Sequence, residues 1–112
     1  MYSEIFNVNY EIRVGSNQGE NDALIKKSSQ HAMWFHLKDF PSPHVVVVNT
    51  ATAGEFDAEV IRRAAMLVKQ RSAVSIRGLR KVGVNYLAVK HVQRTETPGT
   101  VIMLKTPKCI QV

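Results

Sequence analysis

The stretch MWFHLKDFPSPHVVVV (33–48) describes two β-strands separated by a proline-stiffened turn. Residues 33–38 alternate between an apolar face and a more polar face, namely Met33, Phe35 and Leu37 against Trp34, His36 and Lys38. Pro41 and Pro43 lack backbone donors and favour extended neighbours, so the first strand ends before them. The valines at 45–48 show no polar alternation, which is typical of a central strand covered on both faces.

The residues before this stretch predict a strand and then a helix. Residues 5–14 alternate, with Ile12 and Val14 on one face, which indicates a strand or a bent pair of strands. Asn17 is followed three residues later by Glu20, the spacing of a capping box. We therefore expect a helix from Asn17 to about Ser29.

The residues after it predict a second helix and further strands. Thr52 and Glu55 have capping-box spacing, and an apolar stripe from Phe56 to Val68 makes 50–72 the clearest helix. Residues 73–79, 84–94, 99–106 and 108–112 are interpreted as strands, with Pro98-Gly99 marking a turn. The order predicts one α+β domain over residues 1–112, with a largely antiparallel sheet packed against two helices.

Charge is distributed unevenly along the chain. Residues 62–112 carry eleven Lys and Arg and one acid, a net charge of +10, whereas residues 1–61 carry four and eight, a net charge of −4. A basic half of this kind predicts a positive surface that attracts polyanions. The alternative interpretation is a solvated surface that binds nothing specific.

Several classes of protein are disfavoured by composition. Cys109 is the only cysteine, which excludes an intrachain disulfide and a multi-cysteine zinc site. We see no leader pattern at the N-terminus and no apolar run approaching the roughly 20 residues that span a bilayer. We therefore expect a cytoplasmic location and no membrane partner.

The motif WFHLKD-x-P-x-x-H-VVV, together with VGSNQGEND before it and the PGTV turn with its closing strand, closely resembles the NFACT-R domain. That domain is the RNA-binding part of NFACT proteins, and the resemblance extends from about Ile12 to Val112. Two departures are Ser16, where the family usually has arginine, and Pro43 in a turn that usually reads Pro-Gly-Ser-His.

The resemblance implies a non-enzymatic function. NFACT proteins bind the large ribosomal subunit carrying a stalled nascent chain and recruit tRNA. The chain resembles a free-standing NFACT-R domain. A separate protein partner that supplies the missing NFACT domains is compatible with this resemblance, but the sequence does not establish one. We therefore predict an RNA-binding module for tRNA or ribosomal RNA in ribosome-associated quality control, with no cofactor.

Two other kinds of site are weaker alternatives. His36 and His44, with Asp39 in the turn between them, can hold a metal if the strands pair as a hairpin. Cys109 or Ser42 can act as a nucleophile beside a histidine. Neither set has a recognisable signature, so we predict neither a metal site nor an enzyme.

The predicted nucleic-acid contacts combine the polar face of the first core strand with basic side chains. An aromatic, an imidazole and an ammonium in one row can stack a base and contact a phosphate. For Trp34, burial in the core is an equal alternative. The full set is Asn21, Lys26, Lys27, Trp34, His36, Lys38, His44, Arg71, Arg77, Arg80, Lys81, Lys90 and Arg94.

Two further functions compete with RNA binding. The same charges serve sequence-independent DNA binding, since no residue clearly selects the ribose 2′-hydroxyl. Alternatively, the chain is a protein-interaction module that docks on a ribosome- or chromatin-associated partner. Its terminal strand (108–112) would then pair with a strand of that partner.

Overall fold

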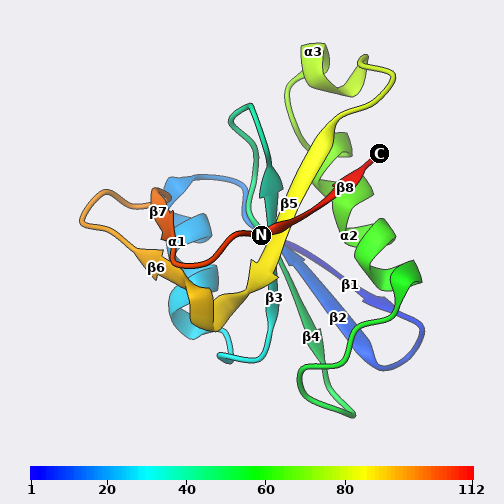
Figure 1. The fold of residues 1–112 in the computed structure, drawn as a ribbon, viewed down its shortest axis with the longest axis vertical. Helices are drawn as coiled ribbons and strands as arrows, with labels where there is room; N and C mark the ends of the chain where they lie inside the picture. The colour runs from blue at the N-terminus through cyan, green and yellow to red at the C-terminus, as the bar shows by residue number, and fades with distance from the viewer.

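The computed structural model describes all residues, 1–112, and places the quoted stretch at the centre of a six-stranded sheet (Figure 1). All pairings between neighbouring strands are antiparallel. Across the sheet the strands are β1 (Tyr2–Phe6), β2 (Tyr10–Val14), β4 (Val45–Asn49), β3 (Met33–Leu37), β5 (Gly83–Ala88) and β8 (Lys108–Gln111). The predicted hairpin is confirmed, because Trp34 pairs with Val46 and Phe35 with Val45.

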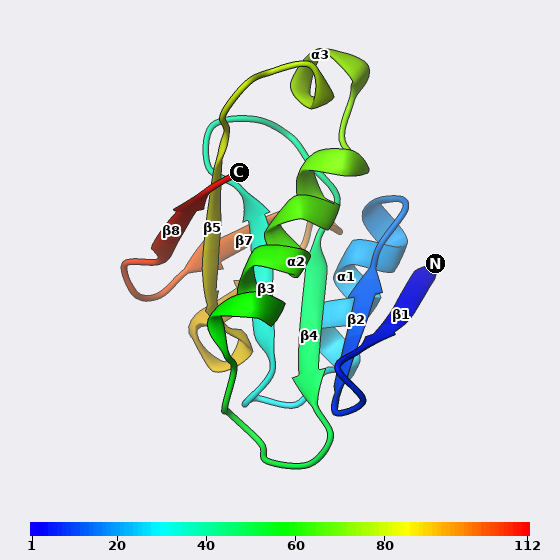
Figure 2. The ribbon, with the colours of Figure 1, turned by 90° about the vertical axis from the view of Figure 1, so that its right-hand side faces the viewer.

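The remaining elements cover the two faces of this sheet. In Figure 2 the helix α2 (Ala58–Gln70) lies in front of the sheet, while α1 (Gln18–Lys27) and a small second sheet lie behind it. The small sheet pairs β6 (Val92–Arg94) with β7 (Val101–Met103). Two short helical turns complete the chain, α3 (Val74–Arg77) and η1 (Val89–His91). The predicted α+β class is confirmed.

Alternation along the central strands produces two cores. Phe35, Val45 and Val47 face α2 and pack with its buried residues. Trp34 and Val46 face the other way and pack against Leu24 and Ile25 of α1 and against the β6–β7 side. Both faces of β4 are therefore buried, as its run of valines predicts.

The first helix begins as predicted. The Asn17 side chain accepts a hydrogen bond from the Glu20 amide at 2.9 Å, and the Glu20 carboxylate accepts one from the Ser16 amide at 2.9 Å. These reciprocal bonds satisfy amides that the first turn leaves unpaired.

The start predicted for the second helix is wrong. The helix begins at Ala58, and its N-cap is Asp57, whose side chain accepts a hydrogen bond from the Val60 amide at 2.8 Å. The Asn49 side chain instead accepts hydrogen bonds from the backbone amides of Ala51 and Thr52, at 2.9 and 2.8 Å. Gly54 then takes a left-handed φ of +83°, which no helix contains. A turn with its own hydrogen bonds therefore replaces the expected first turns of the helix.

Two strand predictions in the C-terminal half are also corrected. Residues 74–77, which were expected to form a strand, form the helical turn α3, in which only Ile76 is buried. The sheet has no place for another strand beside β5, because β3 and β8 flank it. The segment predicted as one strand over 84–94 is broken by η1, so β5 and β6 lie in different sheets. None of the helices combines the length and apolarity needed to cross a membrane.

Candidate nucleic-acid interface

Three aromatic rings meet where β3 ends and β4 begins. Trp34 is 2% exposed, and its Nε1 donates a hydrogen bond to Nδ1 of His44 at 3.1 Å. The His36 ring stacks on Trp34 with centroids 5.8 Å apart and planes 11° apart. The rings of His36 and His44 meet edge to face, with centroids 5.1 Å apart. The two histidines therefore approach each other, as pairing of the two strands in a hairpin allows.

Asn21 fixes the backbone of His44 from the first turns of α1. Its Oδ1 accepts a hydrogen bond from the His44 amide at 3.1 Å, and Asn21 is itself buried. Gly15 and His44 are joined by a backbone hydrogen bond of 3.0 Å, and a Cβ on Gly15 would collide with the Asn21 side chain. The glycine is therefore required by the close approach of Asn21 to the end of β2.

Burial keeps both histidines neutral at pH 7. Desolvation lowers the pKa of His44 to about 4, aided by the nearby His36 and opposed by a hydrogen bond with the Gly99 backbone. Desolvation also lowers the pKa of His36, against a hydrogen bond with the Leu37 backbone. The His36 Nδ1 lies 2.7 Å from the Leu37 carbonyl oxygen. The proton of neutral His36 is therefore assigned to Nδ1, which leaves Nε2 as an acceptor.

A cleft of about 500 Å³ opens over this cluster. One wall is the sheet face at His36 and Asn85, and the other is the segment 99–103 of the small sheet and its turn. The turn after β3 closes one end with Lys38, Asp39 and Phe40.

Three residues of the predicted contact set are buried. Trp34, His44 and Asn21 are 2%, 2% and 8% exposed, and all three have hydrogen bonds within the protein. Trp34 and His44 form part of the inner lining of the cleft, whereas Asn21 lies outside it. The core alternative holds for Trp34. His36 is half-buried and Lys38 is exposed, and both line the cleft. No group of three or more His, Cys, Asp or Glu side chains is arranged to hold a metal ion.

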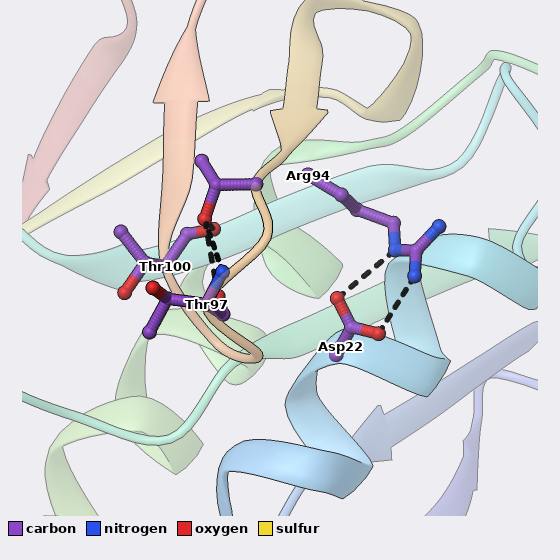
Figure 3. Close-up of polar contacts among 5 residues, drawn as sticks. Asp22, Arg94, Thr97 and Thr100 are labelled. Atoms are coloured by element: carbon purple, nitrogen blue, oxygen red, sulfur yellow. Dashed lines mark hydrogen bonds and ion pairs between the residues drawn. The ribbon is translucent and has the colours of Figure 1, made fainter.

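Arg94 holds the small sheet against α1. Its guanidinium donates two hydrogen bonds to the Asp22 carboxylate, at 2.9 and 2.8 Å (Figure 3). This pairing lowers the pKa of the Asp22 carboxyl. The Thr95 hydroxyl and the backbone at Thr97 and Thr100 close the connecting turn. Arg94 was predicted to contact nucleic acid, but its charge already has a partner.

Most of the other cations have no carboxylate partner. Ion pairs engage only three of the Lys and Arg side chains, Arg13, Arg63 and Arg94. One groove of about 280 Å³ at the end of β5 is lined by Tyr86 and by Lys90, Lys105 and Lys108. A second groove of about 280 Å³, beside the C-terminus, is lined by Arg62, Lys69 and Arg77. We name these the lysine groove and the arginine groove.

The remaining predicted cations lie apart from the cleft. Lys26 and Lys27 are exposed in the last turn of α1. The Arg71 guanidinium lies over the Tyr2 ring at 3.7 Å from its centroid, where it also lines a depression at the start of α1. Arg80 and Lys81 are exposed between α3 and β5.

Several residues of these sites were not predicted. Asn85 lines the cleft because it pairs with His36 across β3 and β5, and Lys105 and Lys108 flank the lysine groove. Alternation around Val84 and Tyr86 indicates that Asn85 faces away from them. Only the strand register shows that it lies beside His36.

Comparison with known proteins agrees with this fold. Residues 2–105 match the NFACT protein RNA binding domain. A curated relative, the coiled-coil domain-containing protein 25 homolog of Dictyostelium discoideum, is 27% identical over 101 residues, 88% of this chain and 48% of that protein. A solved structure, the C-terminal part of the fibronectin/fibrinogen-binding protein from Streptococcus suis, superposes with a TM-score of 0.84 at 28% identity, covering 98% of this chain and 43% of that one.

Fold and comparison together define the class of this protein as an RNA-binding domain. The chain belongs to the NFACT RNA-binding domain family. It spans about half the length of the curated relative and of the solved chain that it matches.

Proposed function

We propose that the chain binds structured RNA, either tRNA or ribosomal RNA, as a non-enzymatic part of ribosome-associated quality control in the cytoplasm. The observation that carries the proposal is that nine of the eleven Lys and Arg side chains in residues 62–112 have no carboxylate partner, within a domain of an RNA-binding family. The partner that this function requires is a surface of the large ribosomal subunit that presents RNA.

The two grooves supply the phosphate contacts. Lysine and arginine side chains flank the β5–β8 edge at both of its ends. Unpaired cations release condensed counterions from RNA when they bind phosphates, whereas a cation already held by a carboxylate contributes little. Tyr86, which stacks on Phe35 at 5.5 Å between centroids, adds an aromatic surface to the lysine groove.

A salt titration of tRNA binding tests the proposal. The logarithm of affinity should fall linearly with the logarithm of salt concentration, since each phosphate contact releases counterions. Replacing Lys90, Lys105 and Lys108 with Gln should weaken binding and flatten the slope by about two to three. The variant Lys38→Gln/Arg80→Gln/Lys81→Gln should also weaken it.

Arg13→Gln provides the control, because Arg13 is ion-paired with Glu11 and should leave the slope unchanged. If tRNA does not bind at low salt, or if both triple variants bind as the unaltered chain does, the proposal is wrong. Competition among tRNA, single-stranded DNA and duplex DNA separates RNA binding from sequence-independent DNA binding.

A second candidate function is strand-to-strand docking of a protein. The terminal strand β8 is an edge of the six-stranded sheet, and Lys108, Cys109 and Gln111 are exposed along it. An exposed edge presents unpaired backbone groups to an extended peptide. Capture of a partner that survives nuclease treatment and is competed by that partner's own strand peptide would favour this candidate.

A further inference from the structure

Asn85 has hydrogen-bonding groups that the protein leaves unused. The residue is 9% exposed, yet its side-chain amide makes no hydrogen bond within the chain. No buried side-chain nitrogen or oxygen atom is both unpartnered and sealed from solvent, so the amide is open to the cleft that Asn85 lines. A side-chain amide with one acceptor and two donors is therefore presented to whatever enters the cleft.

A second hydrogen-bonding group faces the same space. His36 pairs with Asn85 across neighbouring strands, so both side chains lie on the same face of the sheet. The Nδ1 of His36 is engaged by the Leu37 carbonyl, so Nε2 is left as an acceptor. The floor of the cleft thus combines a carboxamide with an imidazole acceptor.

The rim supplies apolar surface and charge. Phe40 and Met103 line the cleft, and each is 41% exposed, a large value for side chains of this kind. Lys38 adds an unpaired cation, and Asp39 adds a carboxylate that can accept a hydroxyl hydrogen bond. A volume of about 500 Å³ lies within the range of small-ligand sites.

We propose that this cleft holds one unpaired RNA nucleotide whose base is adenine or cytosine, the two bases that present an amino group beside an acceptor nitrogen on the pairing edge. The inference rests on the proposed RNA-binding function and assigns the cleft a role distinct from that of the two grooves. The base lies between Phe40 and Met103, Asn85 reads its edge, and Lys38 contacts its phosphate.

The choice of base follows from the polar groups of the floor. An asparagine amide pairs with an amino group and the ring nitrogen beside it, the edge that adenine presents. Cytosine presents the same donor and acceptor pair on its pairing edge. Nε2 of His36 accepts a second amino hydrogen, whereas the carbonyl oxygen of uracil, guanine or hypoxanthine would face that lone pair without a proton between them.

Short oligonucleotides test this directly. Fluorescence anisotropy would compare UUUAUUU with UUUIUUU, in which inosine differs from adenosine by replacement of the amino group with a carbonyl. The unaltered chain should bind the adenosine oligonucleotide about tenfold or more tightly, the discrimination expected of a bidentate base contact. UUUCUUU should resemble the adenosine oligonucleotide, and UUUUUUU the inosine one.

The variant Asn85→Leu should abolish the preference for adenosine over inosine. It removes no hydrogen bond within the protein, so the thermal unfolding midpoint should stay close to that of the unaltered chain. Asn85→Asp, which keeps the shape and loses the amide donors, should also abolish the preference. The control is Gln93→Leu, an exposed amide on β6 outside the lining of the cleft, which should leave discrimination unchanged.

Equal binding of the adenosine and inosine oligonucleotides by the unaltered chain would overturn the inference. This test does not require any variant to fold. Retention of the preference in a folded Asn85→Leu protein would also overturn the inference. In either case, salt-dependent tRNA binding that is weakened by the groove variants would leave the proposed function standing. If no RNA binds at low salt, both proposals fail.

Discussion

The indole of Trp34 and the imidazole of His44 form a buried hydrogen-bonded pair, with Nε1 and Nδ1 3.1 Å apart. The bond requires an imidazole whose Nδ1 carries no proton. Protonation of His44 at Nδ1 would therefore break its hydrogen bond with Trp34, the only tryptophan. His44 is also bonded through its backbone amide to Asn21, so the same change would affect the start of α1.

Acidification should destabilise the fold between about pH 6.5 and pH 4. The pKa of His44 is lowered from 6.5 to about 4 in the folded chain, so the unfolded chain binds the extra proton first. Stability present above pH 6.5 is lost as the pH falls toward 4, by about 3 kcal/mol in total. The lowered pKa of His36 acts in the same direction.

Urea unfolding at several pH values, followed through Trp34 emission, measures this loss. The carboxyls with lowered pKa values, such as Glu4 beside Arg63, lose their contribution only below about pH 4.5 and act in a lower window. His44→Gln keeps an acceptor for Trp34 and should flatten the dependence above pH 4.5. The exposed His31→Gln should not. A flat profile for the unaltered chain would contradict the prediction.

Gly15→Ala should cost about 2 kcal/mol or more in the free energy of unfolding. The new Cβ would collide with the Asn21 side chain and lie 3.0 Å from the Asn21 backbone nitrogen. The collision would displace Asn21 Oδ1, which accepts the hydrogen bond of the buried His44 amide. Thermal and urea unfolding provide the measurement. Gly19→Ala lies in an exposed part of α1, where the nearest atom to the new Cβ is Asn17 Oδ1 at 3.4 Å, and should be neutral or stabilising. Equal effects of the two substitutions would rule out this explanation.

Breaking the Arg94–Asp22 pair should loosen the small sheet selectively. Amide exchange at residues 92–101 should accelerate in Arg94→Gln, while exchange in the central strands β3 and β4 stays slow. Because Asp22 already neutralises Arg94, this substitution should weaken tRNA binding less than Lys105→Gln does. Asp22→Asn, which releases Arg94, should keep or strengthen binding. A larger loss of affinity in Arg94→Gln than in Lys105→Gln would show that Arg94 contacts RNA.

Substitution of Asp57 should decide which residue begins α2. Asp57→Ala removes the acceptor for the Val60 amide and should cost about 1 kcal/mol in unfolding free energy. Thr52→Ala should change stability by less than about 0.5 kcal/mol, since Thr52 lies in a turn and caps nothing. A larger loss of stability in Thr52→Ala than in Asp57→Ala would instead support the capping box of Thr52 and Glu55 that the spacing indicates.

Local patterns predicted the centre of the fold well. Alternation in residues 33–38 and the run of valines depend on the period of a strand and on burial, which sequence records directly. The spacing of Asn17 and Glu20 is likewise a contact between near neighbours. In contrast, Thr52 and Asp57 offer competing caps, and Gly54 with its left-handed backbone decides between them.

The polar face of β3 was harder to predict because its fate depends on distant segments. The two-residue period of a strand places Trp34, His36 and Lys38 on one face. However, α1 and the small sheet bury Trp34, half-bury His36 and leave Lys38 exposed. The charge of Arg94 is visible in the sequence, but its partner lies 72 residues away. Asn85 could be found only from the register of β5 against β3.

The division of strands between two sheets also determines which contacts hold the two sides of the cleft together. Its floor belongs to the six-stranded sheet and its opposite wall to the β6–β7 pair, with no ladder hydrogen bonds joining them. The position of that wall relative to the floor therefore depends on side-chain contacts rather than on a ladder. These contacts are the packing of Val92 and Val101 with Trp34 and the Arg94–Asp22 pair.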